Sequence, residues 1–254
     1  MISPNFFNTI FVIPILNILV VFYKLFLTIS LPGALGFAII GLTSAVRGVL
    51  HPLSKKQMES AKKMQDLKPR LDALKKKHEK DPKGLQQAQL KLYQEAGINP
   101  AAGCLPLLVQ IPFFIALFTT MNLFLSNGGG AKVIAGINKV LYFPILHIDR
   151  IDPWFFGLNL ALSPQKGGNP IYFIVPVITV LLSIWQFRAS QPAAPKEDIK
   201  GTTGDDFQRA MNVQMKYILP LMFGYFSYTW PVGLSLYWNI FSIFTIIQYK
   251  KIQK

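Results

Sequence analysis

The sequence has a single cysteine, Cys104, among 254 residues. One cysteine excludes an internal disulfide framework and any metal cluster that needs several thiolates. Charge is also scarce, since 15% of the residues are charged, whereas soluble domains carry about 25%. Hydrophobic residues make up 51% of the chain, and the mean hydropathy is +0.35. These values predict a protein that crosses a membrane several times rather than a large soluble domain.

Catalytic motifs are missing as well. The sequence contains no HExxH, GxSxG or P-loop motif, and no GxGxxG that opens a helix after a strand. The long apolar segments contain no acidic residue, which argues against a proton relay built from carboxylates. We therefore expect no enzymatic activity, no cofactor and no metal ion.

Five apolar segments reach or approach the length of about 20 residues that a membrane-spanning helix needs. They are residues 34–53, 103–125, 170–187, 214–230 and 234–249. The last two flank the sequence WPVG, where proline and glycine predict a tight turn between two helices. The predicted fold class is all-α, a polytopic membrane protein with a five-span helical bundle in residues 33–254.

Basic residues are distributed unevenly between the two sides that five spans create. One side receives residues 54–99, residues 188–213 and the C-terminal tail, which together with Lys216 hold 20 Lys and Arg. The other side holds five, with Arg47 left out of both counts. Because Lys and Arg concentrate in cytoplasmic loops, the sequence predicts an N-terminus outside and a C-terminus in the cytoplasm.

Residues 6–29 form a further apolar segment with a narrow polar stripe. Asn17, Lys24 and Thr28 recur at helical spacing along it. This pattern favours an amphipathic helix that lies in the outer interface, within residues 1–32, over a sixth span. No basic segment and no small-residue cleavage site precede it, so we expect no cleavable signal peptide.

The basic connection of residues 54–97 predicts a cytoplasmic helical hairpin. Each half carries an apolar stripe at a spacing of three or four residues, and the sequence DPKG (Asp81–Gly84) predicts the turn between them. Pro69 should kink the first helix. Twelve Lys and Arg without a nucleic-acid-binding signature favour a solvated face near a membrane, and no DNA partner is expected. The stripes comprise Met64, Leu67, Leu71, Leu74 and His78 in the first half, and Leu85, Ala88, Leu92 and Ala96 in the second.

Arg47 lies within the first apolar segment, although a charge at the bilayer centre costs about 2.5–3.5 kcal/mol on insertion scales. One interpretation is snorkelling, since a rise of about 1.5 Å per residue places Arg47 about 9 Å before the end of the segment. The other is a water-filled cavity that opens to the cytoplasm. Other polar residues in the apolar segments favour the cavity: Thr43, Ser44, Gln110, Thr119, Asn122, Gln186, Asn239, Ser242 and Gln248.

Three motifs in the correct order resemble the YidC/Oxa/Alb family of membrane protein insertases. The sequence GFAIIGLTSAVRGVLHPLSKKQMESAKKMQDLKPRL is similar to the family's first core span and its cytoplasmic hairpin. INPAAGCLPLLVQIPFFIALF resembles the second core span, and LPLMFGYFSYTWPVGLSLYWNIFSIFTIIQ resembles the closing helical hairpin. The similarity extends over roughly residues 12 to 250.

The resemblance implies a substrate groove that is closed toward the outside and open to the cytoplasm and the lipid. Its groove residues map onto Arg47, Gln186 and Trp238, and Thr43 and Gln110 are further candidates among the polar residues of the spans. The implied function is an insertase and chaperone that accepts nascent membrane proteins and releases their apolar segments laterally, between the first- and fifth-span sides near Trp238. The implied location is a bacterial cell membrane.

The implied partners are nascent membrane proteins, the membrane lipid and, through the cytoplasmic hairpin, a ribosome, a targeting factor and the Sec translocon. We expect a member without the large extracytoplasmic domain that some bacterial members carry. Its tail KKIQK is also much shorter than the ribosome-binding tails of others.

Two other classes of function compete with the insertase. A small-solute channel or secondary transporter would also contain a polar cavity, but such proteins usually show internal repeats or broken helices. A purely structural assembly factor would not need a charge inside the membrane.

Overall fold

The computed structural model describes residues 5–78, 81–97, 105–125, 130–190 and 213–253. These residues are mainly helical, and their only strands are the two-residue β1 (Trp154–Phe155) and β2 (Leu158–Asn159). The predicted all-α class is confirmed. The longer helices are α1 (Ile13–Thr28), α2 (Ala34–Val49), α3 (His51–Asp66), α4 (Lys68–Lys77), α5 (Pro82–Glu95), α6 (Leu105–Leu125), α7 (Ala131–Asn138), α8 (Ile174–Ser190), α10 (Leu219–Thr229) and α11 (Val232–Gln253). Short 3-10 or π turns are Asn8–Val12, Pro144–Leu146, Pro164–Lys166, Pro170–Phe173 and Gln214–Ile218.

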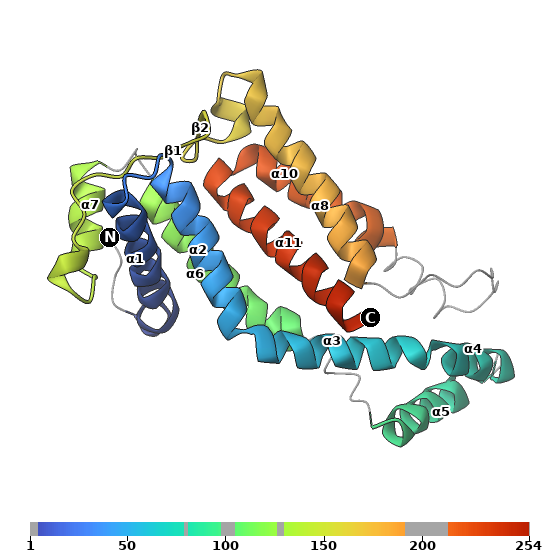
Figure 1. Ribbon diagram of the computed structural model, residues 1–254. Helices are drawn as coiled ribbons and strands as arrows, with labels where there is room; N and C mark the ends of the chain where they lie inside the picture. Colours follow the sequence, from blue (N-terminus) through green and yellow to red (C-terminus); the bar gives the residue numbers. More distant parts are fainter. Residues whose placement is uncertain (1–4, 79–80, 98–104, 126–129, 191–212, 254) are drawn as a thin grey trace.

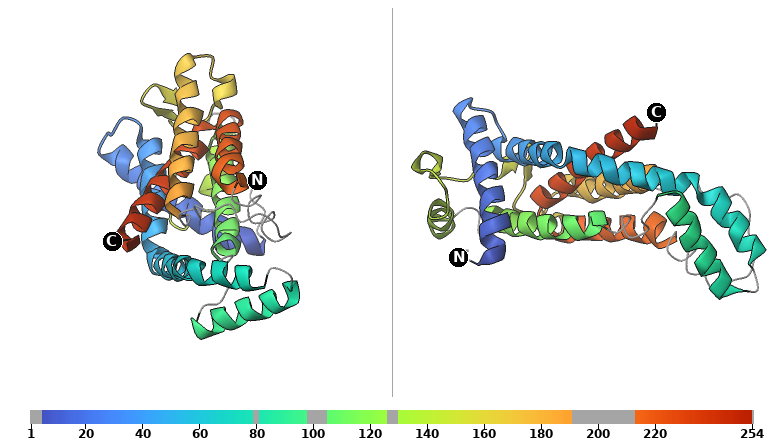
Figure 2. Two further views of the ribbon diagram at one scale, coloured as in Figure 1. Left: turned by 90° about the vertical axis from the view of Figure 1, so that its right-hand side faces the viewer. Right: turned by 90° about the horizontal axis from the view of Figure 1, so that it is seen from below.

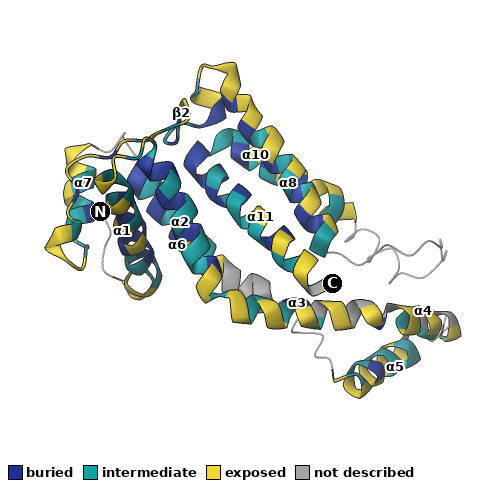
Figure 3. Ribbon diagram, viewed as in Figure 1, coloured by how far each residue is buried: buried dark blue, intermediate teal, exposed yellow. Residues whose placement is uncertain are grey.

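The helices α2, α6, α8, α10 and α11 form an elongated bundle, and α11 lies between α2 and α8 (Figure 1). The charged helices α3, α4 and α5 project from one end of this bundle, and residues 131–173 lie at the other end. Exposed positions lie along the outward faces of α8 and α10 (Figure 3). Several of them are apolar, such as Leu181 and Leu221. Exposed apolar faces of this kind are typical of helices that contact lipid.

Three helical segments in the described part of the chain are long and apolar enough to cross a membrane. They are residues Asn8–Thr28, Pro170–Ser190 and Val232–Lys251. A fourth is present if the bent pair Ala34–Val49 and His51–Ser60 forms one span, and Ile111–Leu125 is a shorter apolar helix. These helices support a multi-pass membrane protein, and the count of five spans stays a prediction.

The helix axis turns by 62° between α2 and α3, within the first predicted span of residues 34–53. Pro52 is the second residue of α3, and a proline has no N–H to donate to the carbonyl group four residues earlier, that of Gly48. Regular bonds resume on either side, from Leu50 N to Val46 O and from Ser54 N to Leu50 O. Arg47 is therefore in the last turn of α2, close to this bend.

The helices α4 and α5 form a hairpin around the predicted apolar stripes. Leu67 and Leu92 form one buried cluster, and Leu71, Leu74 and Ala96 pack against it. The carboxylate of Asp81 accepts a hydrogen bond from Gly84 N at 2.9 Å and so caps the first turn of α5. The helix is interrupted between α3 and α4, next to Pro69, which is the second residue of α4. The side chain of Met64 lies outside the described part.

Residues 131–173 cover the end of the bundle opposite the charged hairpin. The backbone N–H groups of Val232 and Gly233 donate to the carbonyls of Leu162 and Leu160, each at 2.9 Å, at the turn between α10 and α11. On α2, the absence of a side chain at Gly36 leaves room for the ring of Phe155, which would lie only 2.1 Å from an added Cβ atom. These contacts attach residues 131–173 to both halves of the bundle.

The helix α1 crosses α2 and α6, as the right-hand view of Figure 2 shows. One face of α1 is packed into the core through residues such as Leu16, Leu19 and Tyr23. Two residues of the predicted polar stripe, the buried Asn17 and the partly exposed Lys24, bind backbone groups of residues 140–147. This part of the stripe is thus a contact with residues 131–173.

Candidate functional site

The guanidinium group of Arg47 lies between α2 and α11, and the residue is only 7% exposed. Its Nη2 atom donates to the carbonyl of Phe241 at 3.1 Å and to the hydroxyl of Thr245. Its Nη1 atom donates to Gln248 Oε1 at 3.4 Å. The carbon at the centre of the guanidinium group lies 3.7 Å from the ring centroid of Phe241, a cation–π contact. Arg47 therefore connects two helices that are almost 200 residues apart in the sequence.

All of these partners are neutral. In the part of the chain that the structure describes, no carboxylate forms an ion pair with Arg47, and the ion pair between Lys55 and Glu59 lies on α3. The Nε atom of Arg47 is buried and has no hydrogen-bond partner. Because neutral acceptors orient a guanidinium group without cancelling its charge, the site keeps a positive charge and one unused donor.

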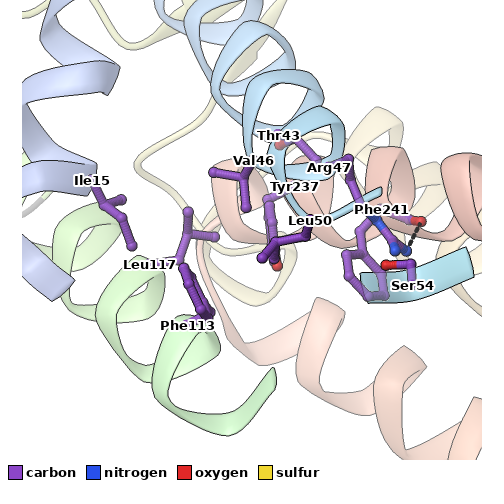
Figure 4. Close-up of a pocket in the computed structure, with 10 residues that line it drawn as sticks. All are labelled: Ile15, Thr43, Val46, Arg47, Leu50, Ser54, Phe113, Leu117, Tyr237 and Phe241. Carbon is purple, nitrogen blue, oxygen red and sulfur yellow. Dashed lines mark hydrogen bonds between the residues drawn. The ribbon is translucent and has the colours of Figure 1, made fainter. Parts of the chain in front are cut away.

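A cavity of about 30 Å³ adjoins Arg47 (Figure 4). A single water needs roughly 10–15 Å³ measured in this way, so the cavity has room for about two waters. The polar groups on its wall come from Thr43, Arg47, Ser54 and Tyr237. The apolar part of the wall comes from Ile15, Val46, Leu50, Phe113, Leu117 and Phe241. In this conformation the site is a small, partly polar cavity that adjoins a buried charge.

The structure brings some of the predicted site residues together and separates others. Thr43 lines the same cavity as Arg47, one helical turn away on α2, and its hydroxyl donates to Ile39 O at 2.6 Å. Trp238 lies elsewhere, where its ring stacks on that of Phe223 at 3.8 Å and its Nε1 donates to Ser183. Trp238 lines a second cavity, of about 10 Å³, among α6, α8, α10 and α11. Gln186 contributes to neither cavity, and the side chain of Gln110 lies outside the described part.

Buried polar side chains also line the contact among α8, α10 and α11. At one end, the hydroxyl groups of Thr179, Ser227 and Ser235 form a hydrogen-bonded chain with distances of 3.1 and 2.8 Å. Further along, Gln186 Oε1 and Ser242 Oγ are buried and have no hydrogen-bond partner. Buried polar atoms usually have partners, so this contact among the helices has unused capacity for hydrogen bonds.

Sequence reasoning missed Phe241 and Thr245 as partners of Arg47. Together with Gln248, which was noted only as a polar residue of the last span, they recur at spacings of four and three on α11. Such residues share one face of a helix. This spacing indicates a face that can bind a charge, but nothing in the sequence pairs that face with Arg47.

Comparison with known proteins gives a consistent result. The family model described as "60Kd inner membrane protein" matches residues 26–254. The ALBINO3-like protein 2 of Chlamydomonas reinhardtii, a chloroplast inner membrane protein, is 36% identical over 218 residues, which cover 83% of this chain and 48% of that protein. The membrane protein insertase YidC of Treponema denticola is 34% identical over 219 residues, or 86% of this chain and 34% of that protein.

The chain thus spans between a third and a half of the length of these relatives. ALBINO3 of Arabidopsis thaliana is 30% identical over 229 residues, which cover 89% of this chain. A match of the family model over most of the chain agrees with the three motifs of the sequence and with the helical bundle. The chain is a member of the 60Kd inner membrane protein family, the family of YidC, Oxa and Alb proteins, whose members are not enzymes.

Proposed function

We propose that this protein is a membrane protein insertase that receives nascent membrane proteins in a groove at Arg47 and releases their apolar segments into the lipid. The observation that carries the proposal is a buried guanidinium group with neutral partners and an unused donor. A charge costs free energy in a low-dielectric environment, so its retention there without a counter-charge needs a reason. An acidic segment of a substrate supplies one.

The physical difficulty in insertion is the passage of a hydrophilic terminus or loop across the apolar layer. A fixed positive charge attracts an acidic segment, and a pair of charges about 4 Å apart is worth about 4 kcal/mol at an effective dielectric constant of about 20. Water in the cavity beside Arg47 would shorten the dry path. The apolar segment of the substrate then leaves sideways, driven by burial at about 25 cal/mol per Å². No nucleotide is needed for these steps.

We place the proposed lateral exit at the contact between α2 and α11 rather than beside the ring of Trp238. Trp238 packs toward Phe223 and Ser183, whereas the contact between the first and fifth spans is crossed by Arg47. When an acidic segment of a substrate binds the guanidinium group of Arg47, it replaces the hydrogen bonds from Arg47 to α11. Binding of the substrate and separation of α2 from α11 are coupled in this proposal.

The proposed orientation places α3, α4 and α5 in the cytoplasm, and α1 and residues 131–173 on the outer side. The uneven distribution of basic residues supports this orientation. The amphipathic α1 is proposed to lie in the outer interface. The hairpin of α4 and α5, which projects from the bundle, is the proposed contact for a ribosome, a targeting factor or the Sec translocon (Figure 1).

Reconstitution of the full chain into liposomes tests the proposed function. A single-span substrate with a short acidic N-terminal segment is added without nucleotide, and protection of that segment from an external protease is measured. Protection that requires the protein is the expected result. Flux of small solutes without protection would instead indicate a channel or transporter.

A further inference from the structure

Polar side chains of α1 hold the backbone of residues 140–147, which we call the outer apolar loop. Asn17 Nδ2 donates to Val140 O at 3.2 Å, and Asn17 Oδ1 accepts from Tyr142 N at 2.8 Å. Lys24 Nζ donates to His147 O at 2.9 Å and also to Ile145 O. The loop is thus fixed near both of its ends, and several of its backbone polar groups have partners within the protein.

The side chains between these two attachments are apolar and point away from the protein. Tyr142, Phe143 and Ile145 are 56%, 62% and 79% exposed. Charged residues flank the loop in the sequence, with Lys139 before it and Asp149 after it, and both are exposed. An apolar segment between charged residues, with its backbone bonded inward, is typical of a segment that lies at a membrane surface.

The exposed face of α1 continues the same surface. Ile18, Val21 and Leu25 are exposed and lie at spacings of three and four residues, so they share one face of the helix. Val21 is four residues after Asn17 and three before Lys24, and this stripe therefore runs beside the side chains that hold the loop. The apolar surface of α1 and the outer apolar loop form one patch.

We propose that this patch is a lipid-binding surface, in which Tyr142, Phe143 and Ile145 enter the lipid leaflet at the end of the bundle opposite the charged hairpin. Lipid is favoured over a protein partner because the patch belongs to a multi-pass membrane protein and carries an aromatic side chain suited to the interface. Backbone groups in the apolar layer need internal partners, and Asn17 and Lys24 supply them. Lys24 is a positioning residue, because its bonds to the loop backbone hold the apolar side chains of the loop in the lipid leaflet.

This inference uses the proposed function only to identify the leaflet as the outer one, because contact with lipid does not depend on orientation. It also does not depend on Arg47, whose partners belong to a different part of the bundle. A failure of insertion and a failure of lipid contact are therefore separate results. Together, α1 and the outer apolar loop would fix how deeply this end of the protein lies in the bilayer.

Spin labels on the full chain in vesicles of phosphatidylcholine and phosphatidylglycerol test the proposal. With Cys104→Ser as background, Ile145→Cys is labelled and compared with the matched control Asp149→Cys, an exposed position on the same connection. Collision with oxygen, which concentrates in lipid, and with a water-soluble nickel chelate is measured by electron paramagnetic resonance. At position 145 we expect oxygen collisions to exceed nickel collisions severalfold, and at position 149 the reverse.

Equal nickel access at the two positions would overturn the proposal, because the loop would then be in water. Low access of both reagents at position 145 would also overturn it, because a protein partner or a second copy of the chain would cover the loop. Lys24→Met should raise nickel access at position 145 at least twofold, and Lys24→Arg should leave it unchanged. Unchanged nickel access in Lys24→Met would refute the role of Lys24. The label at position 145 in the protein that keeps Lys24 tests the lipid contact independently of that role.

Discussion

Replacement of Arg47 by methionine separates its structural contacts from its charge. Methionine keeps most of the apolar length of the side chain but removes three hydrogen bonds and the contact with the ring of Phe241. Hydrogen bonds between side chains in membrane proteins average about 0.6 kcal/mol, and a cation–π contact adds about 0.5–2 kcal/mol. The lost contacts therefore amount to about 2–4 kcal/mol.

The removal of a buried charge offsets part of this loss. A charge taken from water into the protein carries a desolvation penalty of several kcal/mol, about as large as the lost contacts. We therefore expect the melting temperature of Arg47→Met in detergent to lie within about 5 °C of that of the unaltered protein, since about 1 kcal/mol corresponds to about 2–4 °C for a chain of this size. Arg47→Lys keeps the charge but cannot reproduce the planar fork of donors.

The assay is insertion into liposomes of a series of single-span substrates whose translocated segment carries zero to three acidic residues. A charge pair at contact is worth about 1–4 kcal/mol between the dielectric limits of water and the protein surface, so insertion of an acidic segment by Arg47→Met should fall at least about fivefold. A neutral segment should change less than twofold. Arg47→Lys should retain most of the activity on acidic segments.

Arg188→Met is the matched control, because Arg188 is exposed in the last turn of α8. This variant also loses one positive charge, but from the surface and not from the site, so it should insert the whole series normally. Equal losses of Arg47→Met on neutral and acidic segments would refute the reasoning. Arg47 would then act only as a connection between α2 and α11, and snorkelling or packing would explain its retention.

Three further predictions concern other parts of the molecule. In cells, a Lys77→Cys variant should react with an impermeant thiol reagent only after the membrane is opened, whereas Lys139→Cys should react in intact cells; the opposite pattern would reverse the proposed orientation. Gly36→Val should destabilise the protein by about 1–3 kcal/mol because its side chain would clash with the ring of Phe155, and Phe155→Ala should recover part of the melting temperature; no recovery would exclude this clash. Leu92→Asp should unfold the α4–α5 hairpin, measured by proteolysis, and reduce insertion from ribosome-bound chains, whereas full insertion would remove the hairpin from the proposed partner contacts.

The sequence predicted the parts of the fold that depend on composition and on local chemistry. The apolar stripes of the hairpin are spaced so that only one pairing buries them, and Leu67 and Leu92 are buried as expected. Pro69 and Asp81 act locally, on the break between two helices and on the first turn of the next one. These effects need no knowledge of distant residues, and so they can be read from the sequence.

The partners of Arg47 were not predictable in the same way. They lie on α11, almost 200 residues away, and a carbonyl group such as that of Phe241 gives no signal in a sequence. The partners of the polar stripe of α1 were not predictable for a related reason. A stripe that faces water and a stripe that binds the backbone of a distant loop have the same spacing, and the contacts of Asn17 with Val140 and Tyr142 decide between them.

The basic side chains of Arg47, which is buried, and Lys24, which is partly exposed, have different kinds of partner, and the difference supports the proposed roles. Lys24 donates to two backbone carbonyls of one loop, so its charge orders a local segment. Arg47 shares its donors between the backbone and two side chains of another helix, and it keeps one donor unused beside a cavity. The present partners of Arg47 are neutral, and a guanidinium group binds a carboxylate more strongly than a neutral acceptor. An acidic group that enters the cavity therefore forms stronger bonds to Arg47 than the ones it replaces. In the proposed function, this arrangement holds α2 and α11 together at rest, and a charged substrate separates them.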